Sequence, residues 1–443
     1  MALIKIKRGF DLNLKGKITE ETVSPIKKCD NYAIVPDDFS GIIPRMEKKE
    51  GESVMAGEAL FHDKNDEKIK VTSPVSGIVK KVVRGERRKI MAIVIEADGK
   101  NTNKEFDTRE TPRSLLLESG LWPMMRQRPY DIVPSSLARP RDIFITAFDS
   151  APLAPSLKLV LGDNEKYLPK AVDILSTMTD GKVYIGLPSH YNIIDTGAEV
   201  NTFDGPHPAG NAGVQIANLK PVNKGDVVWT LDVVTAARIG KLFETGVVDY
   251  STTVALTGSG IISPHYVKAT MGCTLESILK DEIVADEKPK RIISGNVLTG
   301  IKEEIDGYLH APYRHVTVIN EINKKDEFMG WASLSPKKYS IYRDFTAWIF
   351  GGRHKTVDLD AKINGGERAI VMSGEYDNMI PMDIYSEFLI KAIISFDIDK
   401  MEQLGIYEVA PEDFALAEFA DTSKLELQRI VREGLDKMRA EMT

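Results

Sequence analysis

The stretch WPMMRQRPYDIVP, residues 122–134, gathers residue types that could line a pocket for a small and mostly apolar ligand. It holds a tryptophan, two methionines, a tyrosine and two arginines within an extended, proline-containing segment. Pockets of this kind combine apolar and aromatic side chains with a few polar groups that orient the ligand. The alternative is a structural linker whose aromatic side chains pack between domains while its arginines form surface ion pairs. The candidate ligand contacts are Trp122, Met125, Arg126, Arg128 and Tyr130.

A second candidate is His207, which lies between two prolines in FDGPHPAG, residues 203–210. A rigid turn of this composition can fix an imidazole toward a ligand, and histidine exchanges a proton near neutral pH. The alternative is a turn between domains in which His207 caps backbone groups. The seven histidines of the chain are scattered, so no protein-bound metal is expected.

A third candidate site is charged. KKVVRGERRK, residues 80–89, has six basic residues and one acid in a chain of formal net charge −7. Arginines on a hairpin can dock an acidic partner or an anionic membrane surface, so Arg84, Arg87 and Arg88 are candidate docking residues. The alternative is a solvated strand edge whose charges prevent pairing with other strands.

Composition excludes several classes of protein. The 443 residues suffice for about three domains with real cores. The acidic balance disfavours nucleic acid as a partner, and no apolar run approaches the roughly 18 residues of a membrane span. The start, MALIKIKRGFDL, lacks the apolar core of a secretory signal, which favours the cytoplasm. Two cysteines, Cys29 and Cys273, are too few for a four-cysteine zinc site or a cysteine-ligated iron–sulfur cluster.

Four units are expected along the chain, giving a multidomain fold of β and α/β class. Residues 1–105 alternate short β-type segments, beginning with KIKRG, with glycine turns, in the pattern of a barrel-sandwich hybrid of the biotinyl or lipoyl type. Residues 106–255 start with a proline-rich linker and continue as a Rossmann-like domain of alternating strands and helices, ending with the strand STTVALTG. Residues 256–330 predict a small β-grasp-like unit of SLBB type. Residues 331–443 predict an irregular segment followed by a C-terminal helical domain.

The last predicted helix lies in SKLELQRIVREGLDKMRAEM. Its apolar residues recur at steps of three and four, which predicts one buried face. Ser423 and Glu426 have the spacing of a capping box at its start. The predicted buried face consists of Leu427, Val431, Leu435 and Met438.

The barrel-sandwich pattern raises the question of a carrier lysine, which in biotinyl and lipoyl domains sits at the tip of a tight hairpin. The corresponding interval, HDKNDEKIK, has lysines at positions 64, 68 and 70. None is flanked by methionines or by the small and acidic residues that the modifying ligases require. We interpret the interval as a solvated loop without a carrier lysine.

Several segments, taken together and in this order, resemble one family over nearly the whole chain. The chain is similar to the A subunit of the bacterial sodium-translocating NADH:quinone oxidoreductase. It is more distantly similar to the C subunit of the Rnf complex and to the NADH/flavin subunit of respiratory complex I. The segments that carry the resemblance are PRMEKKEGESVMAGEALFHDK, SPVSGIVKKVVRGERR, ARPRDIFITAFDSAPLAP, FDGPHPAGNAGVQI, TGSGI, RIISGNVLTG and NGGERAIV.

The resemblance implies a peripheral subunit on the cytoplasmic face of the bacterial inner membrane. It would work with five other subunits that pass electrons from NADH to ubiquinone and export sodium, and it would reach the membrane through those partners. It implies no tightly bound cofactor, no catalytic residue in this chain, a role in assembly and a link to ubiquinone. For a quinone, Trp122 and Met125 would form the wall beside the ring. Arg126, Arg128 and Tyr130 would be donors to its carbonyl oxygens. His207 would exchange a proton beside the ring, since quinone reduction consumes two protons.

Two other functions remain open. The chain could bind flavin or NADH as its distant relatives do, but it has no G-x-G-x-x-G turn. Those relatives also hold iron–sulfur clusters on cysteines in their C-terminal helices, whereas FADTSKLELQ near the end of this chain has no cysteine. The segment VLGDNEKYLP also places Asp163 and Glu165 near a helix start, where they would repel a phosphate. The chain could instead be an unmodified scaffold of the carrier type.

Overall fold

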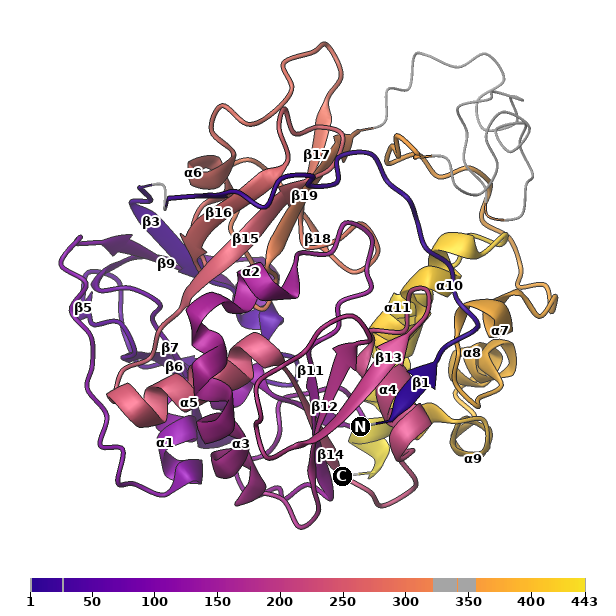
Figure 1. Cartoon of the computed structure of the whole chain (residues 1–443), viewed down its shortest axis with the longest axis horizontal. Coiled ribbons are helices and arrows are strands. Elements are labelled where there is room, and N and C mark those ends of the chain that lie inside the picture. Colours follow the sequence, from indigo (N-terminus) through magenta and orange to yellow (C-terminus); the bar gives the residue numbers. More distant parts are fainter. Residues whose placement is uncertain (1, 26–27, 322–340, 342–355, 443) are drawn as a thin grey trace.

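The computed structural model describes residues 2–25, 28–321, 341 and 356–442. Part of the irregular segment expected after residue 330 therefore lies outside the described residues. The described chain forms four sheets and a group of C-terminal helices. In Figure 1 the barrel-sandwich strands lie at the left, the α/β unit below, a mixed sheet above and the yellow C-terminal helices at the right. The predicted fold class is confirmed.

Residues 31–97 form the barrel-sandwich hybrid. One sheet has the order β3-β9-β8-β5 and the other the order β4-β6-β7. Alternate side chains of a strand point to opposite faces, and Phe61, Val79, Ile93 and Ile95 fill the space between the sheets. The strands are β3 (Asn31–Ile34), β4 (Pro44–Met46), β5 (Ser53–Val54), β6 (Ala59–Asp63), β7 (Asp66–Thr72), β8 (Gly77–Arg84) and β9 (Ile90–Ala97).

The turn between β6 and β7 consists of Lys64 and Asn65, so the strands fill most of the interval that we interpreted as a loop. This turn is packed against the body of the chain. The Lys64 amide donates to the Ile43 carbonyl at 2.8 Å, and the Ser136 amide donates to Asp66 Oδ2 at 2.9 Å. A swinging arm needs a tip free of such contacts, so the packing favours the interpretation without a carrier lysine.

The α/β unit is a six-stranded sheet of order β1-β13-β12-β11-β14-β10. Its first five strands are parallel, and β10 joins the edge antiparallel to β14. The segment KIKRG, which we expected within the barrel-sandwich unit, overlaps β1 and lies in this sheet beside β13. The strands are β1 (Leu3–Lys5), β10 (Arg126–Arg128), β11 (Asp142–Thr146), β12 (Val183–Pro188), β13 (Glu199–Asp204) and β14 (Val228–Asp232).

Helices cover both faces of this sheet, as a buried parallel sheet requires. On one face α2 (Leu157–Leu161), α3 (Leu168–Ser176) and α5 (Val233–Thr245) pack together. On the other face α4 (Ala212–Leu219) packs with the C-terminal helices. The helix α1 (Pro112–Ser119) instead packs on β7 and connects the barrel-sandwich unit to the α/β unit.

The junction between β14 and α5 shows how the sequence fixes these elements. Asp232 ends β14 and caps α5, because its Oδ1 accepts from the amides of Val234 at 2.9 Å and Thr235 at 3.0 Å. These bonds satisfy amides that have no partner within the helix. Gly246, with φ 72°, ends the helix. The carboxylate of Asp232 is therefore fixed at the carboxyl end of the sheet.

The third unit is a mixed sheet of order β18-β17-β19-β15-β16-β2. The segment STTVALTG, predicted to be part of the Rossmann-like sheet, contains β15, which pairs antiparallel with β16 in this mixed sheet. Its first three residues are exposed or only partly buried, whereas the central strands β11, β12 and β14 of the parallel sheet are buried over nearly their whole length. The elements are β2 (Val23–Ser24), β15 (Ser251–Thr257), β16 (His265–Thr270), β17 (Lys290–Ser294), β18 (Ile301–Glu303), β19 (His315–Asn320) and the helix α6 (Leu275–Leu279).

The C-terminal helices pack against α4 and bury the predicted face of the last helix. Leu427, Val431, Leu435 and Met438 are all fully buried. The predicted capping box is wrong, because the helix begins at Leu427 and the Ser423 hydroxyl donates to the Ala369 carbonyl. The helices are α7 (Glu375–Met379), α8 (Ser386–Ser395), α9 (Ile398–Gln403), α10 (Ala415–Ala420) and α11 (Leu427–Met442).

Candidate functional site

A cavity of about 540 Å³ lies at the carboxyl ends of β11 and β14. After β11 the chain adds β12 and β13 on one side and then crosses back to add β14 on the other. Ligands of open parallel sheets bind at such a switch point. All four units contribute to the walls, and the main lining segments are residues 37–40, 146–149, 230–234, 313–315 and 411–412.

Two buried histidines line this cavity. His207 is 3% exposed and His315 is 4% exposed, and the Nε2 atom of each is buried with no hydrogen-bond partner among the described residues. Burial lowers the pKa of both imidazoles, and nearby Asp149 opposes this only in part. Both rings are therefore neutral at pH 7, and each retains an unused polar atom.

Ser150 and Gly210 fix the orientation of the His207 ring. Ser150 Oγ lies 3.1 Å from His207 Nδ1 and accepts from the Gly210 amide at 2.8 Å. A serine hydroxyl can donate to Nδ1 or accept from it, so this contact holds the ring in either tautomer. In both tautomers Nε2 is the buried ring nitrogen without a partner among the described residues.

The rest of the lining is mixed in character. Phe39, Met124, Phe148, Leu157 and Val160 supply apolar surface. Polar lining comes from Arg126, Tyr313 and Arg314, together with several carboxylates. Small-molecule sites have this composition: apolar walls with a few oriented polar groups.

The N-terminus of α5 opens onto this cavity, but it already holds a carboxylate. Asp232 caps the helix, and its Oδ1 also forms an ion pair with Arg314 Nη2 at 2.7 Å. A phosphate bound at the same helix end would meet this negative charge. The geometry therefore disfavours a dinucleotide held in the manner of a Rossmann fold.

The structure divides the predicted ligand contacts into two groups. Arg126 and His207 line the cavity, whereas Trp122, Met125, Arg128 and Tyr130 do not. Trp122 and Met125 belong to the core, where Trp122 Nε1 donates to the Pro134 carbonyl at 2.8 Å. Met124, the neighbour of Met125, faces the cavity instead. Sequence reasoning missed His315, Asp149 and Tyr313, which come from distant parts of the chain.

Arg128 and Tyr130 connect the α/β unit to the C-terminal helices. Arg128 is 1% exposed and binds Asp413 Oδ2 at 2.8 Å, Glu412 Oε1 at 3.1 Å and the Glu408 carbonyl at 2.8 Å. The carbonyl of Tyr130 accepts from Arg432 Nη2 at 2.6 Å. Both nitrogens at the end of the Arg128 guanidinium are thus engaged within the chain.

Three family profiles match along the chain in sequence order. Residues 4–98 match the NqrA N-terminal barrel-sandwich hybrid domain, residues 108–248 the NqrA second alpha/beta domain and residues 253–304 the NQRA C-terminal domain. The A subunit of the Na(+)-translocating NADH-quinone reductase of Vibrio anguillarum is 34% identical over 99% of this chain and 100% of its own length. The chain belongs to the NqrA family. The corresponding protein of a Neisseria meningitidis strain, 32% identical, covers the same shares of both chains.

The family assignment confirms the resemblance found in the sequence. A chain of an NAD+-reducing [NiFe]-hydrogenase aligns with 48% of this NqrA-family chain and 47% of its own, at a TM-score of 0.34 and 13% identity. That likeness is too weak to carry an argument. Within the described ranges, no group of three or more His, Cys, Asp or Glu side chains is arranged to hold a metal ion. None of the helices built from described residues has the length and apolar character that a bilayer crossing requires.

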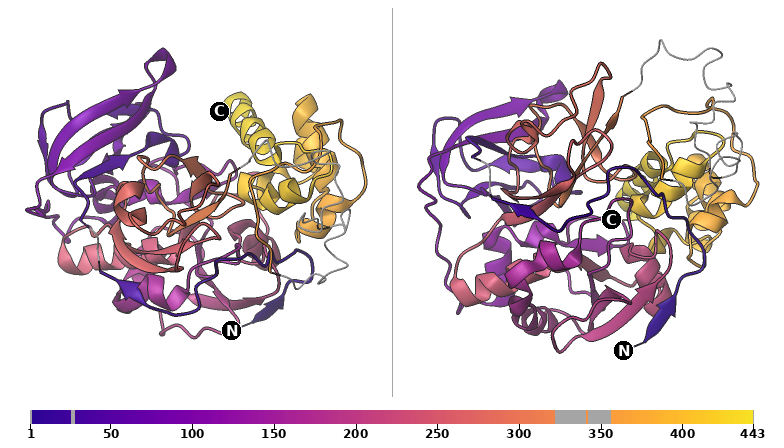
Figure 2. Two further views of the ribbon diagram at one scale, coloured as in Figure 1. Left: turned by 90° about the horizontal axis from the view of Figure 1, so that it is seen from above. Right: turned by 45° about the horizontal axis from the view of Figure 1, so that its top comes forward.

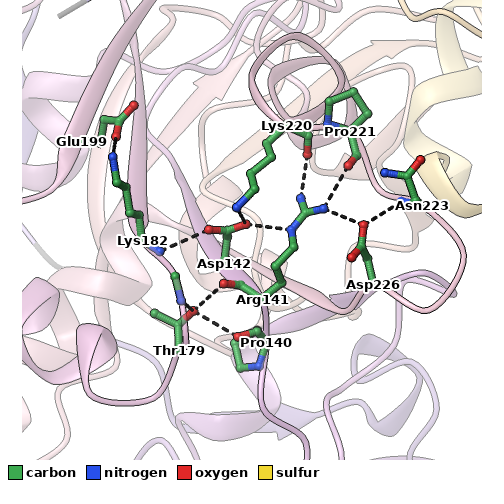
Figure 3. A network of polar contacts seen from close by, with 11 residues as sticks. Pro140, Arg141, Asp142, Thr179, Lys182, Glu199, Lys220, Pro221, Asn223 and Asp226 are labelled. Atoms are coloured by element: carbon green, nitrogen blue, oxygen red, sulfur yellow. Dashed lines mark hydrogen bonds and ion pairs between the residues drawn. The ribbon is translucent and has the colours of Figure 1, made fainter.

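A polar network fixes the other end of β11 in this NqrA-family chain (Figure 3). Asp142, fully buried, accepts from the Lys182 amide at 3.1 Å and from Arg141 Nε at 2.7 Å, and it pairs with Lys220 Nζ at 2.7 Å. Arg141 also binds Asp226 Oδ2 at 2.6 Å and the Lys220 carbonyl at 2.8 Å. The start of β11 is thereby held against β12 and the end of α4, which sets where Thr146 meets the cavity.

A histidine between two carboxylates joins the barrel-sandwich unit to the mixed sheet beside the cavity. His310 Nδ1 lies 2.6 Å from Asp38 Oδ1, and Nε2 lies 2.6 Å from Glu303 Oε1. Asp38 also accepts from the Ala311 amide at 3.0 Å, and its carbonyl accepts from Arg126 Nη2 at 2.5 Å. This His310 clamp fixes the position of Arg126 in the cavity wall.

The His310 clamp should make stability depend on pH. Burial lowers the pKa of His310, but the bonds to Asp38 and Glu303 outweigh it and raise this pKa from 6.5 to about 9. The stabilisation is therefore complete below pH 6.5 and disappears as the pH rises through about 9. His310→Gln should lower the free energy of unfolding near pH 6.5 by on the order of 2–3 kcal/mol. Part of this loss is offset, because burial raises the pKa of Asp38 and the ionised Asp38 carboxylate is therefore itself costly to bury. Denaturant titrations at several pH values between 6.5 and 9 measure this dependence. If the free energy of unfolding changed with pH by the same amount in the parent and in the variant, the stabilising role of the His310 clamp would be contradicted.

Proposed function

We propose that this chain acts as the A subunit of a sodium-translocating NADH:ubiquinone reductase. It would assist the reduction of ubiquinone coupled to sodium export, together with five other subunits, at the cytoplasmic face of the bacterial inner membrane. In this role the chain carries no redox centre of its own. The observation that carries the proposal is the similarity, over 99% of the chain, to relatives that bear the name of that subunit.

Within this role, the cavity is the proposed site of the ubiquinone headgroup. A neutral quinone ring needs apolar walls and donors to its carbonyl oxygens, and the cavity offers Phe148 and Met124 beside Arg126 and His207. The Nε2 atom of the neutral His207 imidazole has no partner among the described residues, so in its Nε2–H tautomer the ring would donate to a quinone carbonyl without leaving a buried charge. The combination suits a neutral acceptor better than an anion, because Asp232 already occupies the end of α5.

The role of the chain can be tested by reconstituting the complex with and without it. We expect omission to abolish NADH-driven reduction of a short-chain ubiquinone, while NADH oxidation by a soluble one-electron acceptor such as ferricyanide continues. The acceptor assay shows that the remaining subunits still take electrons from NADH. Ubiquinone reduction at an unchanged rate without this chain would contradict the proposal.

A further inference from the structure

The β8–β9 hairpin ends in a compact tip, residues 84–91. The Lys89 amide donates to the Glu86 carbonyl at 3.0 Å, and the Gly85 amide donates to the Lys89 carbonyl at 2.9 Å. Arg87 and Arg88 have positive φ angles of 51° and 62°, so this tight turn holds two arginines in an uncommon backbone conformation. In the left view of Figure 2 the purple strands of the barrel-sandwich unit rise clear of the rest of the chain.

The tip and its flank carry positive charge that the described residues do not neutralise. Lys81, Arg84, Arg87 and Arg88 are exposed, and none of them forms an ion pair with a described residue. Their neighbours differ, because Lys80 pairs with Glu96 at 3.1 Å and Lys89 pairs with Asp37 at 2.6 Å. Against these four cations stand Glu86 in the tip and Glu50, whose Oε1 accepts from the Val82 amide at 2.7 Å in the flank, so the tip and its flank remain positive on a chain of net charge −7.

An apolar side chain accompanies these cations at the tip. Met91 is 41% exposed and lies over Gly85, where an added Cβ would come within 3.1 Å of the Met91 Sδ. Cationic side chains beside an exposed apolar one are typical of surfaces that bind the interface of an anionic bilayer. An acidic protein partner would use the cations but leave Met91 without an evident role.

We propose that this hairpin tip docks on the anionic phospholipid headgroups of a membrane surface. The rest of the chain is acidic and is repelled by such a surface, so the tip also sets the orientation of the bound chain. The ion pair between Lys89 and Asp37 connects the tip to residues 37–40, which line the cavity. Docking therefore brings this wall of the cavity toward the bilayer. That consequence matters for a lipid-soluble quinone only if the proposed function holds, whereas the docking itself does not depend on it.

The docking is tested by sedimentation of the full chain with vesicles, without any quinone. We expect binding to vesicles of phosphatidylglycerol mixed with phosphatidylcholine, weak binding to pure phosphatidylcholine, and loss of binding as salt is raised. The variant Arg84→Ala/Arg87→Ala/Arg88→Ala should bind the anionic vesicles on the order of 100-fold more weakly, since each basic residue contributes roughly fivefold. The matched lysine variant at the same three positions keeps the charge and should bind within a few-fold of the parent.

A control with the same change of net charge is Lys158→Ala/Lys170→Ala/Lys268→Ala, whose exposed lysines lie elsewhere on the surface. It should bind anionic vesicles like the parent. The proposal is overturned if the parent chain does not bind anionic vesicles, if it binds neutral ones equally, or if the triple-alanine tip variant still binds. Quinone affinity measured in detergent should be unchanged in the tip variant, so the two proposals can fail separately.

Discussion

Asp413→Asn is expected to lower the free energy of unfolding by about 3–5 kcal/mol. Asp413 is fully buried, and its Oδ2 lies 2.8 Å from Nη1 of Arg128, which is 1% exposed. Asparagine keeps the shape of the side chain but leaves the guanidinium charge buried without its main partner. Because this pair joins β10 to the C-terminal helices, the loss should appear as a lower denaturant midpoint of the chain.

Glu412→Gln is the matched control for this prediction. Glu412 also binds Arg128, at 3.1 Å, but its side chain is 45% exposed, so its loss should cost less than about 1 kcal/mol. A second variant, Arg128→Met/Asp413→Leu, removes both charges and should recover much of the lost stability. Equal midpoints for the parent and Asp413→Asn would show that the buried pair does not hold the units together.

The second large effect concerns the cavity. His207→Ala/His315→Ala should weaken binding of a short-chain ubiquinone by roughly 10- to 100-fold, because two hydrogen bonds to the headgroup are lost at about 0.5–1.5 kcal/mol each. His207→Gln keeps an N–H donor and should retain much of the affinity. Binding can be followed by quenching of tryptophan fluorescence during titration with the quinone.

The matched control is His190→Ala, because His190 is exposed on the same α/β unit and does not line the cavity. Its affinity should equal that of the parent. If the double variant binds ubiquinone as tightly as His190→Ala does, the two histidines are not headgroup donors. If the double variant fails to fold, as judged by its unfolding midpoint, the single variants decide the matter. His207→Ala should then bind on the order of 2- to 10-fold more weakly than His207→Gln, and equal affinities of these two variants would show that His207 is not a headgroup donor.

Most of the fold prediction rested on local sequence patterns, namely the spacing of apolar residues along each segment. The alternation of apolar residues within the barrel-sandwich strands and the face of α11 are properties of contiguous sequence, and both appear in the structure. The assignment of β1 and β15 to the wrong sheets has a physical reason. A strand of three residues such as β1 has no period to detect, and a strand's own sequence does not say which neighbour it will pair with.

The start of α11 shows a similar limit. A capping box was predicted from Ser423 and Glu426, which are close in sequence. Instead the amide of Gln428 donates to Glu418 Oε2 at 2.8 Å, across the turn from α10. A cap supplied by tertiary packing leaves no local signal, so only the buried face of this helix could be predicted.

The candidate site was predictable only where its residues were unusual by themselves. His207, between two prolines, and Arg126 stood out from their neighbours and do line the cavity. Arg128 was predicted to contact the ligand for the same reason, but it pairs with Asp413, which is 285 positions away. No local sequence pattern predicts a buried ion pair between residues so far apart. His315 begins the strand β19 and resembles an ordinary strand residue until the fold brings it to the cavity.

The central claim is that the cavity at the ends of β11 and β14 receives the ubiquinone headgroup. Its most direct test is photo-crosslinking of a ubiquinone analogue, reactive at the ring, to the assembled complex, followed by peptide mapping. We expect label on the lining segments 37–40, 146–149 and 313–315, and we expect competing ubiquinone to reduce it. Label confined to other subunits, or to parts of this chain away from the cavity, would contradict it.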